Sequence, residues 1–139
     1  MRTYWDTSAA INAALSSKVF QRLDNGKHLA RLHLLAEFFA TMTGRGVEIT
    51  DAAGNTDRLV FTQNECAAWL RKFAGRLEFE ELTKDEALTA IDKAQRIGVQ
   101  GARVYDYWHA LVSNKAKANE LITRNIRHFQ GLAENVAWP

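Results

Sequence analysis

Residues 2–15, RTYWDTSAAINAAL, place a short aromatic strand directly before an alanine-rich, helix-forming run. Asp6, Thr7 and Ser8 stand at the junction. All three residue types are good helix N-caps, so capping alone is a sufficient explanation for them. In a parallel sheet, however, the same junction lies at the carboxyl edge, where binding sites collect. The segment therefore predicts an α/β fold and makes Asp6 a candidate site residue.

The rest of the chain continues the alternation of strands and helices. Capping-box spacing occurs at Thr62 and Glu65 and again at Thr83 and Glu86, so a helix is expected after each pair. We expect further helices over 28–42, buried on several sides, and from 103 to 117, strands over 76–82 and 120–123, a hairpin or extended segment over 47–61, and a polar turn over 124–129. This order predicts a three-layer α/β/α sandwich with a mostly parallel sheet, in one domain spanning residues 1–139.

Composition narrows the chemistry and the compartment. The single cysteine, Cys66, has no partner, which excludes an intramolecular disulfide and a cysteine-based zinc site. No apolar run is long enough to cross a bilayer, so we expect a cytoplasmic protein without a membrane segment. The net charge is +2, but residues 48–92 carry 10 acids and 5 bases, whereas residues 96–131 carry 6 bases and 2 acids. The C-terminal third is therefore the expected anion-facing side, with ordinary solvated surface as the alternative.

Two further carboxylates stand where a carboxylate is costly. Glu37 lies among leucines, phenylalanines and alanines, and Asp106 lies in RVYDYWHAL. An ionised carboxylate in such surroundings needs a positive partner. His33 is one candidate partner for Glu37, and Asp106, like Asp6, could serve only as a cap. Three acids at one sheet edge would instead be stabilised by a divalent cation, and oxygen ligands favour Mg²⁺ or Mn²⁺.

The ordered segments YWDTSA, HLLAEFFATMTG, GARVYDYWHAL and ITRNIRHF resemble the PIN domain of VapC-type toxins from toxin–antitoxin pairs. The resemblance covers essentially the whole chain. It implies a PIN-like α/β/α sandwich whose acids bind Mg²⁺ or Mn²⁺ and cut RNA. Many PIN domains have a fourth acid in the last of these segments, where this chain has Asn125; the substitution makes tight binding of a second metal doubtful.

The resemblance assigns roles residue by residue. Asp6, Glu37 and Asp106 are the expected metal ligands, with Glu37 binding through water or orienting the attacking water. Together with Asn125 these acids form the expected catalytic set. The expected substrate-binding residues are Thr7, Ser8, Arg103, Thr123, Arg124 and Arg127, with His128 as a further backbone contact. The expected activity is that of a metal-dependent endoribonuclease.

The resemblance also implies partners: a cognate antitoxin that covers the acidic pocket, and a homodimer or toxin–antitoxin hetero-oligomer. Part of the antitoxin groove is expected on 28–42 with Phe38 and Phe39, although both rings could be core. Three other interpretations remain at this point. They are a non-catalytic RNA- or protein-binding module with a degraded metal site, an aspartyl-nucleophile phosphatase or dehalogenase, which Ser8 disfavours, and a zinc site at His33 and Glu37, which lacks a further ligand.

Overall fold

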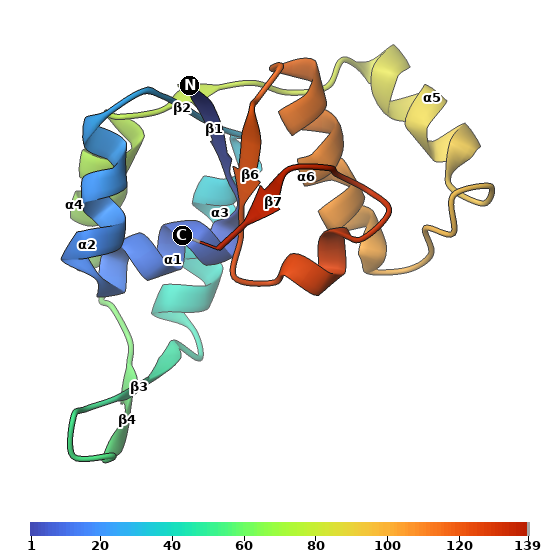
Figure 1. Cartoon of the computed structure of the whole chain (residues 1–139). Helices are drawn as coiled ribbons and strands as arrows, with labels where there is room; N and C mark the ends of the chain where they lie inside the picture. The colour runs from blue at the N-terminus through green and yellow to red at the C-terminus, as the bar shows by residue number, and fades with distance from the viewer. Residues whose placement is uncertain (139) are drawn as a thin grey trace.

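A five-stranded parallel sheet forms the centre of the computed structural model, which describes residues 1–138 (Figure 1). The strands lie in the order β5-β2-β1-β6-β7, and every neighbouring pair is parallel. Their bounds are β1 Arg2–Trp5, β2 Lys27–Ala30, β5 Glu78–Phe79, β6 Glu120–Ile122 and β7 Val136–Ala137. The predicted α/β class with a parallel sheet is confirmed.

Helices connect the strands and cover the sheet. They are α1 (Thr7–Leu15), α2 (Ser17–Phe20), α3 (His33–Thr43), α4 (Gln63–Ala74), α5 (Lys84–Lys93) and α6 (Arg103–Lys115), with short 3₁₀ turns η1 (Gln21–Asp24) and η2 (Ile126–Phe129). Both predicted capping boxes are present: the Thr62 and Thr83 hydroxyls accept from the backbone N–H groups of Glu65 and Glu86, whose carboxylates accept in return. These local signals were sufficient to locate α4 and α5.

Alternating side chains on the central strands enter two separate cores. On β1, Tyr4 packs beside α6 with Leu29 and Leu121, whereas Trp5 packs on the opposite face. In the other two central strands, Ala30 of β2 and Ile122 of β6 pack on the same face as Trp5. Because successive residues of a strand point to opposite faces, this pattern places helices on both sides of the sheet. The arrangement is consistent with a three-layer sandwich.

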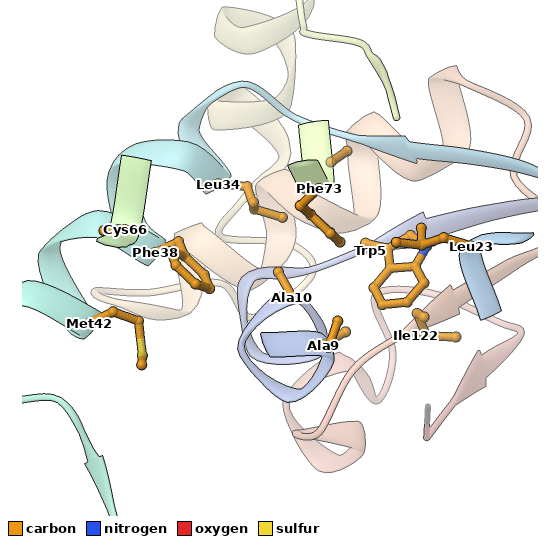
Figure 2. Packing of buried hydrophobic residues seen from close by; sticks show 12 residues of the cluster. Trp5, Ala9, Ala10, Leu23, Leu34, Phe38, Met42, Cys66, Phe73 and Ile122 are labelled. Carbon is orange, nitrogen blue, oxygen red and sulfur yellow. The ribbon is translucent and has the colours of Figure 1, made fainter. Parts of the chain in front are cut away.

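The larger core lies between the sheet and α1, α3 and α4. Figure 2 shows Trp5, Phe38 and Phe73 gathered around the small side chains of α1. Trp69 stacks between Phe38 and Phe73, with ring centroids 4.6 and 4.8 Å apart. The buried alanines of α1 let the helix pack closely on the sheet, and Asp6 alone separates its first residue from the end of β1.

The predicted helix over 28–42 is wrong in its first part. Lys27–Ala30 form strand β2, and α3 begins only at His33. Because β2 is buried on both faces, His28, Leu29 and Ala30 form a continuous buried run without the alternation that marks a strand. The expectation of burial on several sides is also wrong, because α3 buries only one stripe, with Leu34 and Phe38 in it and Phe39 exposed.

Other boundaries differ more modestly. The predicted strand over 76–82 is only two residues long, and the predicted turn over 124–129 contains η2. The segment over 47–61 is confirmed as a hairpin: β3 (Val47–Thr50) and β4 (Thr56–Leu59) pair antiparallel and project from the body of the molecule (Figure 1). Strand β1 pairs with β2 on one side and with β6 on the other, and the candidate site lies at the ends of these strands.

Replacing Phe38 by Ala should lower the free energy of unfolding by about 3–5 kcal/mol, because its buried ring stacks on Trp69. Urea denaturation followed by circular dichroism measures the loss. Phe39→Ala is the matched control, since Phe39 is 40% exposed, and should change the value by less than about 1 kcal/mol. Equal effects of the two substitutions would contradict the orientation of α3.

Candidate functional site

Asp6 is the most deeply buried of the predicted site residues that carry a charge. It follows β1 and caps α1, and only 5% of its surface is exposed. Its Oδ1 accepts hydrogen bonds from the Ala9 backbone N–H at 2.9 Å and the Ser8 hydroxyl at 2.7 Å. Its Oδ2 accepts a short hydrogen bond from the Thr123 hydroxyl. Asp6 is therefore both the helix cap and the centre of a polar network.

Two hydroxyl groups are oriented so that their protons point at Asp6. Ser8 Oγ accepts from the Arg124 backbone N–H at 2.8 Å, and Thr123 Oγ1 accepts from the Asn125 backbone N–H at 2.9 Å. Each hydroxyl has one proton, and each donates it to Asp6. The backbone after β6 thus fixes the hydroxyls, and the hydroxyls fix the carboxylate.

The protonation of Asp6 depends on two opposing effects. Burial raises its pKa, and the charge on His109 and the hydrogen bond from Thr123 act against that rise; burial prevails and the pKa is raised. A carboxylate has about four acceptor positions, of which the three donors fill three. One acceptor position, on Oδ2, is left for a further donor or a cation.

Glu37 projects from α3 toward two histidines. Its Oε1 lies 3.6 Å from His109 Nε2 and 3.7 Å from His33 Nε2. Both distances are too long for a direct hydrogen bond, and Oε1 is a buried oxygen without a hydrogen-bond partner. Burial alone would raise the pKa of Glu37, but His109 and His33 outweigh it and the pKa is lowered.

The Thr7 hydroxyl lies next to this orphaned oxygen. It contributes to the lowered pKa of Glu37, yet Thr7 Oγ1 is itself buried without a hydrogen bond of normal geometry. Two buried polar atoms that face the same space without a partner are unusual. Both atoms therefore keep unused hydrogen-bonding capacity for a small polar ligand, such as a water or an ion.

Asp106 lies in the first turn of α6, beside a shallow basic hollow. Burial raises its pKa, His128 and His109 lower it, and the charge on Asp6 raises it further; the net shift is upward. His128 Nδ1 is 3.8 Å from its Oδ2. A hollow of about 310 Å³ is lined by Asp106 together with Arg103, Arg127 and His128. An acid and three cationic or titratable groups therefore share one opening.

His109 is the common neighbour of the three predicted acids. It lies one turn after Asp106, is buried, and contacts Glu37 through Nε2. When protonated, it lowers the pKa of Asp6, Glu37 and Asp106 alike. Acids from the β1–α1 junction, α3 and α6 thus lie within electrostatic range of one histidine. In the sequence, the only signal for His109 was a histidine one turn after an acid.

The other predicted residues divide into two groups. Ser8 and Thr123 belong to the Asp6 network, and Thr7 faces Glu37. Arg103 and Arg127 line the hollow beside Asp106, whereas Arg124 and Asn125 are exposed after the end of β6. Arg103 donates to the Gln130 carbonyl, Arg124 lies over the Trp138 ring at 5.4 Å, and the Asn125 side chain is exposed next to Thr123.

The candidate ligands are carboxylate and hydroxyl oxygens, which are the atoms that a hard divalent cation prefers. One of them, Glu37 Oε1, has no hydrogen-bond partner. The geometry is not preassembled. Within residues 1–138, no three side chains of the types His, Cys, Asp and Glu are placed closely enough to hold a metal ion. Cation binding at Asp6, Glu37 and Asp106 therefore requires side chains to move closer together.

Another hollow, larger than the one beside Asp106, lies elsewhere and has a different lining. Its volume is about 730 Å³, and its walls include Asn114, Asn119, Glu120 and Asn135. Glu120 begins β6, so this hollow opens toward the amino end of that strand, away from Thr123. No predicted site residue lines it. Its carboxylates and amides offer no cationic group for a phosphate, so we place the site at the carboxyl edge.

Comparisons of the sequence with models of protein families and with curated proteins gave no match. Among residues 1–138, no helix combines the length and apolar character needed to cross a membrane.

The pKa of Asp6 generates a prediction about stability. Because the native pKa is raised above the ordinary value of 3.8, the stability associated with protonated Asp6 is present below that value and is lost as the pH rises through the native pKa. Asp6→Asn keeps a neutral cap at every pH. The melting temperature of Asp6→Asn relative to wild type should therefore increase by several degrees between pH 4 and pH 7.

Differential scanning calorimetry without divalent cations measures this difference. Glu48→Gln, on the exposed hairpin strand β3, is the control and should show no such trend. A melting-temperature difference between Asp6→Asn and wild type that stays constant or falls with pH would contradict the raised pKa.

Proposed function

We propose that this chain is a metal-dependent endoribonuclease that hydrolyses RNA phosphodiester bonds. The observation that supports it best is that Asp6, Glu37 and Asp106 all lie within electrostatic range of His109, at the carboxyl edge of a parallel sheet. A basic hollow opens beside Asp106. The charge on Asp6 raises the pKa of Asp106, so these two acids disfavour each other's ionisation, and a divalent cation removes that penalty.

The proposal gives each acid a role. Asp6 and Asp106 hold Mg²⁺ or Mn²⁺, Asp6 through its remaining Oδ2 position. The chemistry that such a cation supplies when bound is a lowered pKa of a water and neutralised charge on phosphoryl oxygens. Glu37, whose pKa is lowered, stays ionised and orients the attacking water. Ser8 and Thr123 keep the Asp6 carboxylate in place.

Arg103, Arg127 and His128 bind the RNA backbone in this proposal. They line the hollow next to Asp106, and phosphate contacts of this kind give affinity without sequence preference. Thr7 is a further contact to the phosphate. Asn125 stands where the resembling PIN domains have a fourth acid, and the smaller negative charge there supports a single metal ion rather than two.

The proposed biological role is that of the toxin in a toxin–antitoxin pair, in the cytoplasm. Its partner is a cognate antitoxin that covers the acidic pocket, in a homodimer or a hetero-oligomer. This role rests on the resemblance of the sequence motifs to PIN domains of VapC-type toxins. Of the two phenylalanines expected in the antitoxin groove, Phe39 is exposed and Phe38 is buried, so only Phe39 is available to a partner.

A second function, a non-catalytic module that binds RNA or protein, is favoured by one observation. The described acids do not form a ready cation site. In that case the basic hollow binds RNA, and cleavage does not occur. Metal-dependent cleavage separates the two functions.

Asp6→Asn and Asp106→Asn should each reduce RNA cleavage in Mg²⁺ or Mn²⁺ by at least about 100-fold, because each removes a charge that holds the cation. Cleavage of a mixed-sequence, fluorescently labelled RNA followed on denaturing gels measures the rate. Glu48→Gln is the control and should cleave at the wild-type rate. Wild-type RNA binding without cleavage in either metal would favour the non-catalytic module, and undiminished cutting by the Asp variants would contradict the assignment.

Arg127→Gln should weaken RNA binding and make it less sensitive to salt. On single-stranded RNA, the slope of log affinity against log salt decreases by about 0.7 for every phosphate that the protein no longer neutralises. Fluorescence anisotropy in EDTA, at several salt concentrations, measures both effects. Arg45→Gln, at the base of the hairpin, is the matched control. If the two substitutions change the slope equally, the hollow beside Asp106 does not bind the RNA backbone.

A further inference from the structure

Tyr4 and His109 form a buried pair that connects β1 to the candidate site. The Tyr4 oxygen lies 2.7 Å from His109 Nδ1, and the two rings meet edge-on with centroids 5.8 Å apart. Tyr4 is completely buried, and 4% of His109 is exposed. The other ring nitrogen, Nε2, lies 3.6 Å from Glu37 Oε1. One imidazole therefore stands between a phenol and a carboxylate.

The donors and acceptors around this ring indicate where its proton lies. An ionised carboxylate only accepts, so the nitrogen that faces Glu37 is best protonated. At the other end, burial raises the pKa of Tyr4 and keeps its phenol protonated, and the hydrogen-bond partner of the Tyr4 oxygen is His109 Nδ1. The phenol proton is then free to point at His109, and Nδ1 must accept it. Both neighbours favour the same neutral tautomer, with the proton on Nε2.

We propose that Tyr4 locks His109 in the Nε2-protonated neutral tautomer, and that His109 is thereby a positioning residue that aims its N–H at Glu37. The tautomer follows from the buried contacts alone. The consequence for cleavage rests on the proposed function, which gives Glu37 the attacking water. The distance of 3.6 Å is longer than a hydrogen bond, and closure of this gap would fix Oε1.

His28 provides an internal reference for the tautomer. The Trp5 indole N–H donates to His28 Nδ1 at 3.0 Å, and His28 Nε2 lies 2.7 Å from the Asn25 carbonyl. An indole N–H can only donate and a carbonyl can only accept, so a neutral His28 carries its proton on Nε2. Tyr4 and Trp5, which are successive residues of β1, thus each determine the tautomer of one buried histidine, and the two histidines lie on opposite faces of the sheet.

Nuclear magnetic resonance of the full chain labelled with ¹⁵N-histidine, at about pH 8 and without metal, tests the tautomer. This pH lies above the ordinary histidine pKa of about 6.5. We expect His109 and His28 to show the same pattern, with Nε2 protonated and Nδ1 accepting a hydrogen bond. Tyr4→Phe keeps the ring but removes the hydroxyl, so Nδ1 of His109 should shift toward the value of a free ring nitrogen while His28 stays unchanged. A His109 protonated on Nδ1, alone or as imidazolium, would overturn the proposal, and so would a spectrum that Tyr4→Phe does not alter.

The positioning role is tested with two substitutions at His109. The amide of Gln can place an N–H donor near the Nε2 position, whereas Leu fills similar volume without a donor. We expect His109→Gln to keep the ¹³C carboxyl resonance of Glu37 close to wild type and His109→Leu to shift or broaden it. In RNA cleavage, His109→Leu should lower kcat about tenfold more than His109→Gln, with similar KM.

These readouts separate the two levels of the proposal. If the wild-type chain cleaves no RNA, the proposed function fails, but the ¹⁵N and ¹³C resonances still decide whether His109 positions Glu37. If cleavage occurs and Gln and Leu at position 109 behave alike in both kcat and the Glu37 resonance, the positioning role is wrong while the nuclease proposal stands. Melting temperatures of all variants verify that each is folded.

Discussion

The carboxylate of Asp6 holds together the three elements on which the candidate site depends. It follows β1, caps α1 through Ala9, and accepts the Thr123 hydroxyl at the end of β6. A buried carboxylate is costly unless several donors meet it, and here three do. The donors are in turn oriented by backbone N–H groups of the loop after β6. The same interaction therefore supports the fold and fixes the acid that the proposed chemistry requires.

The two-sided burial of the sheet explains how distant acids reach this carboxylate. On one face of β1, Tyr4 packs against α6; on the other face, Trp5 packs in the core formed with α1, α3 and α4. Asp106 and His109 lie on α6, and Glu37 lies on α3, so the packing of these helices on the sheet positions them. The packing of apolar side chains thus determines which polar groups meet at the carboxyl edge. His109, held by Tyr4, then lies among all three acids.

The sequence predicted the features whose causes are local. The capping boxes of α4 and α5 and the strand–helix junction at Asp6 depend on a few adjacent residues. Strand β2 was misread as helix, because a strand buried on both faces has no alternating pattern, and the two-residue β7 gave no signal. Glu37 and Asp106 were identifiable as carboxylates in apolar surroundings. The relation of His109 to Glu37 was not, since it arises only when α3 and α6 meet the same sheet edge.

The central claim is that Asp6 and Asp106 share one divalent cation, and a crystal structure of the chain grown with Mn²⁺ tests it most directly. Anomalous scattering locates manganese without reference to activity. The account predicts one strong peak between the Asp6 and Asp106 carboxylates, with the Glu37 side chain turned toward it. A peak elsewhere, or a saturated crystal with no peak between these two acids, would contradict it.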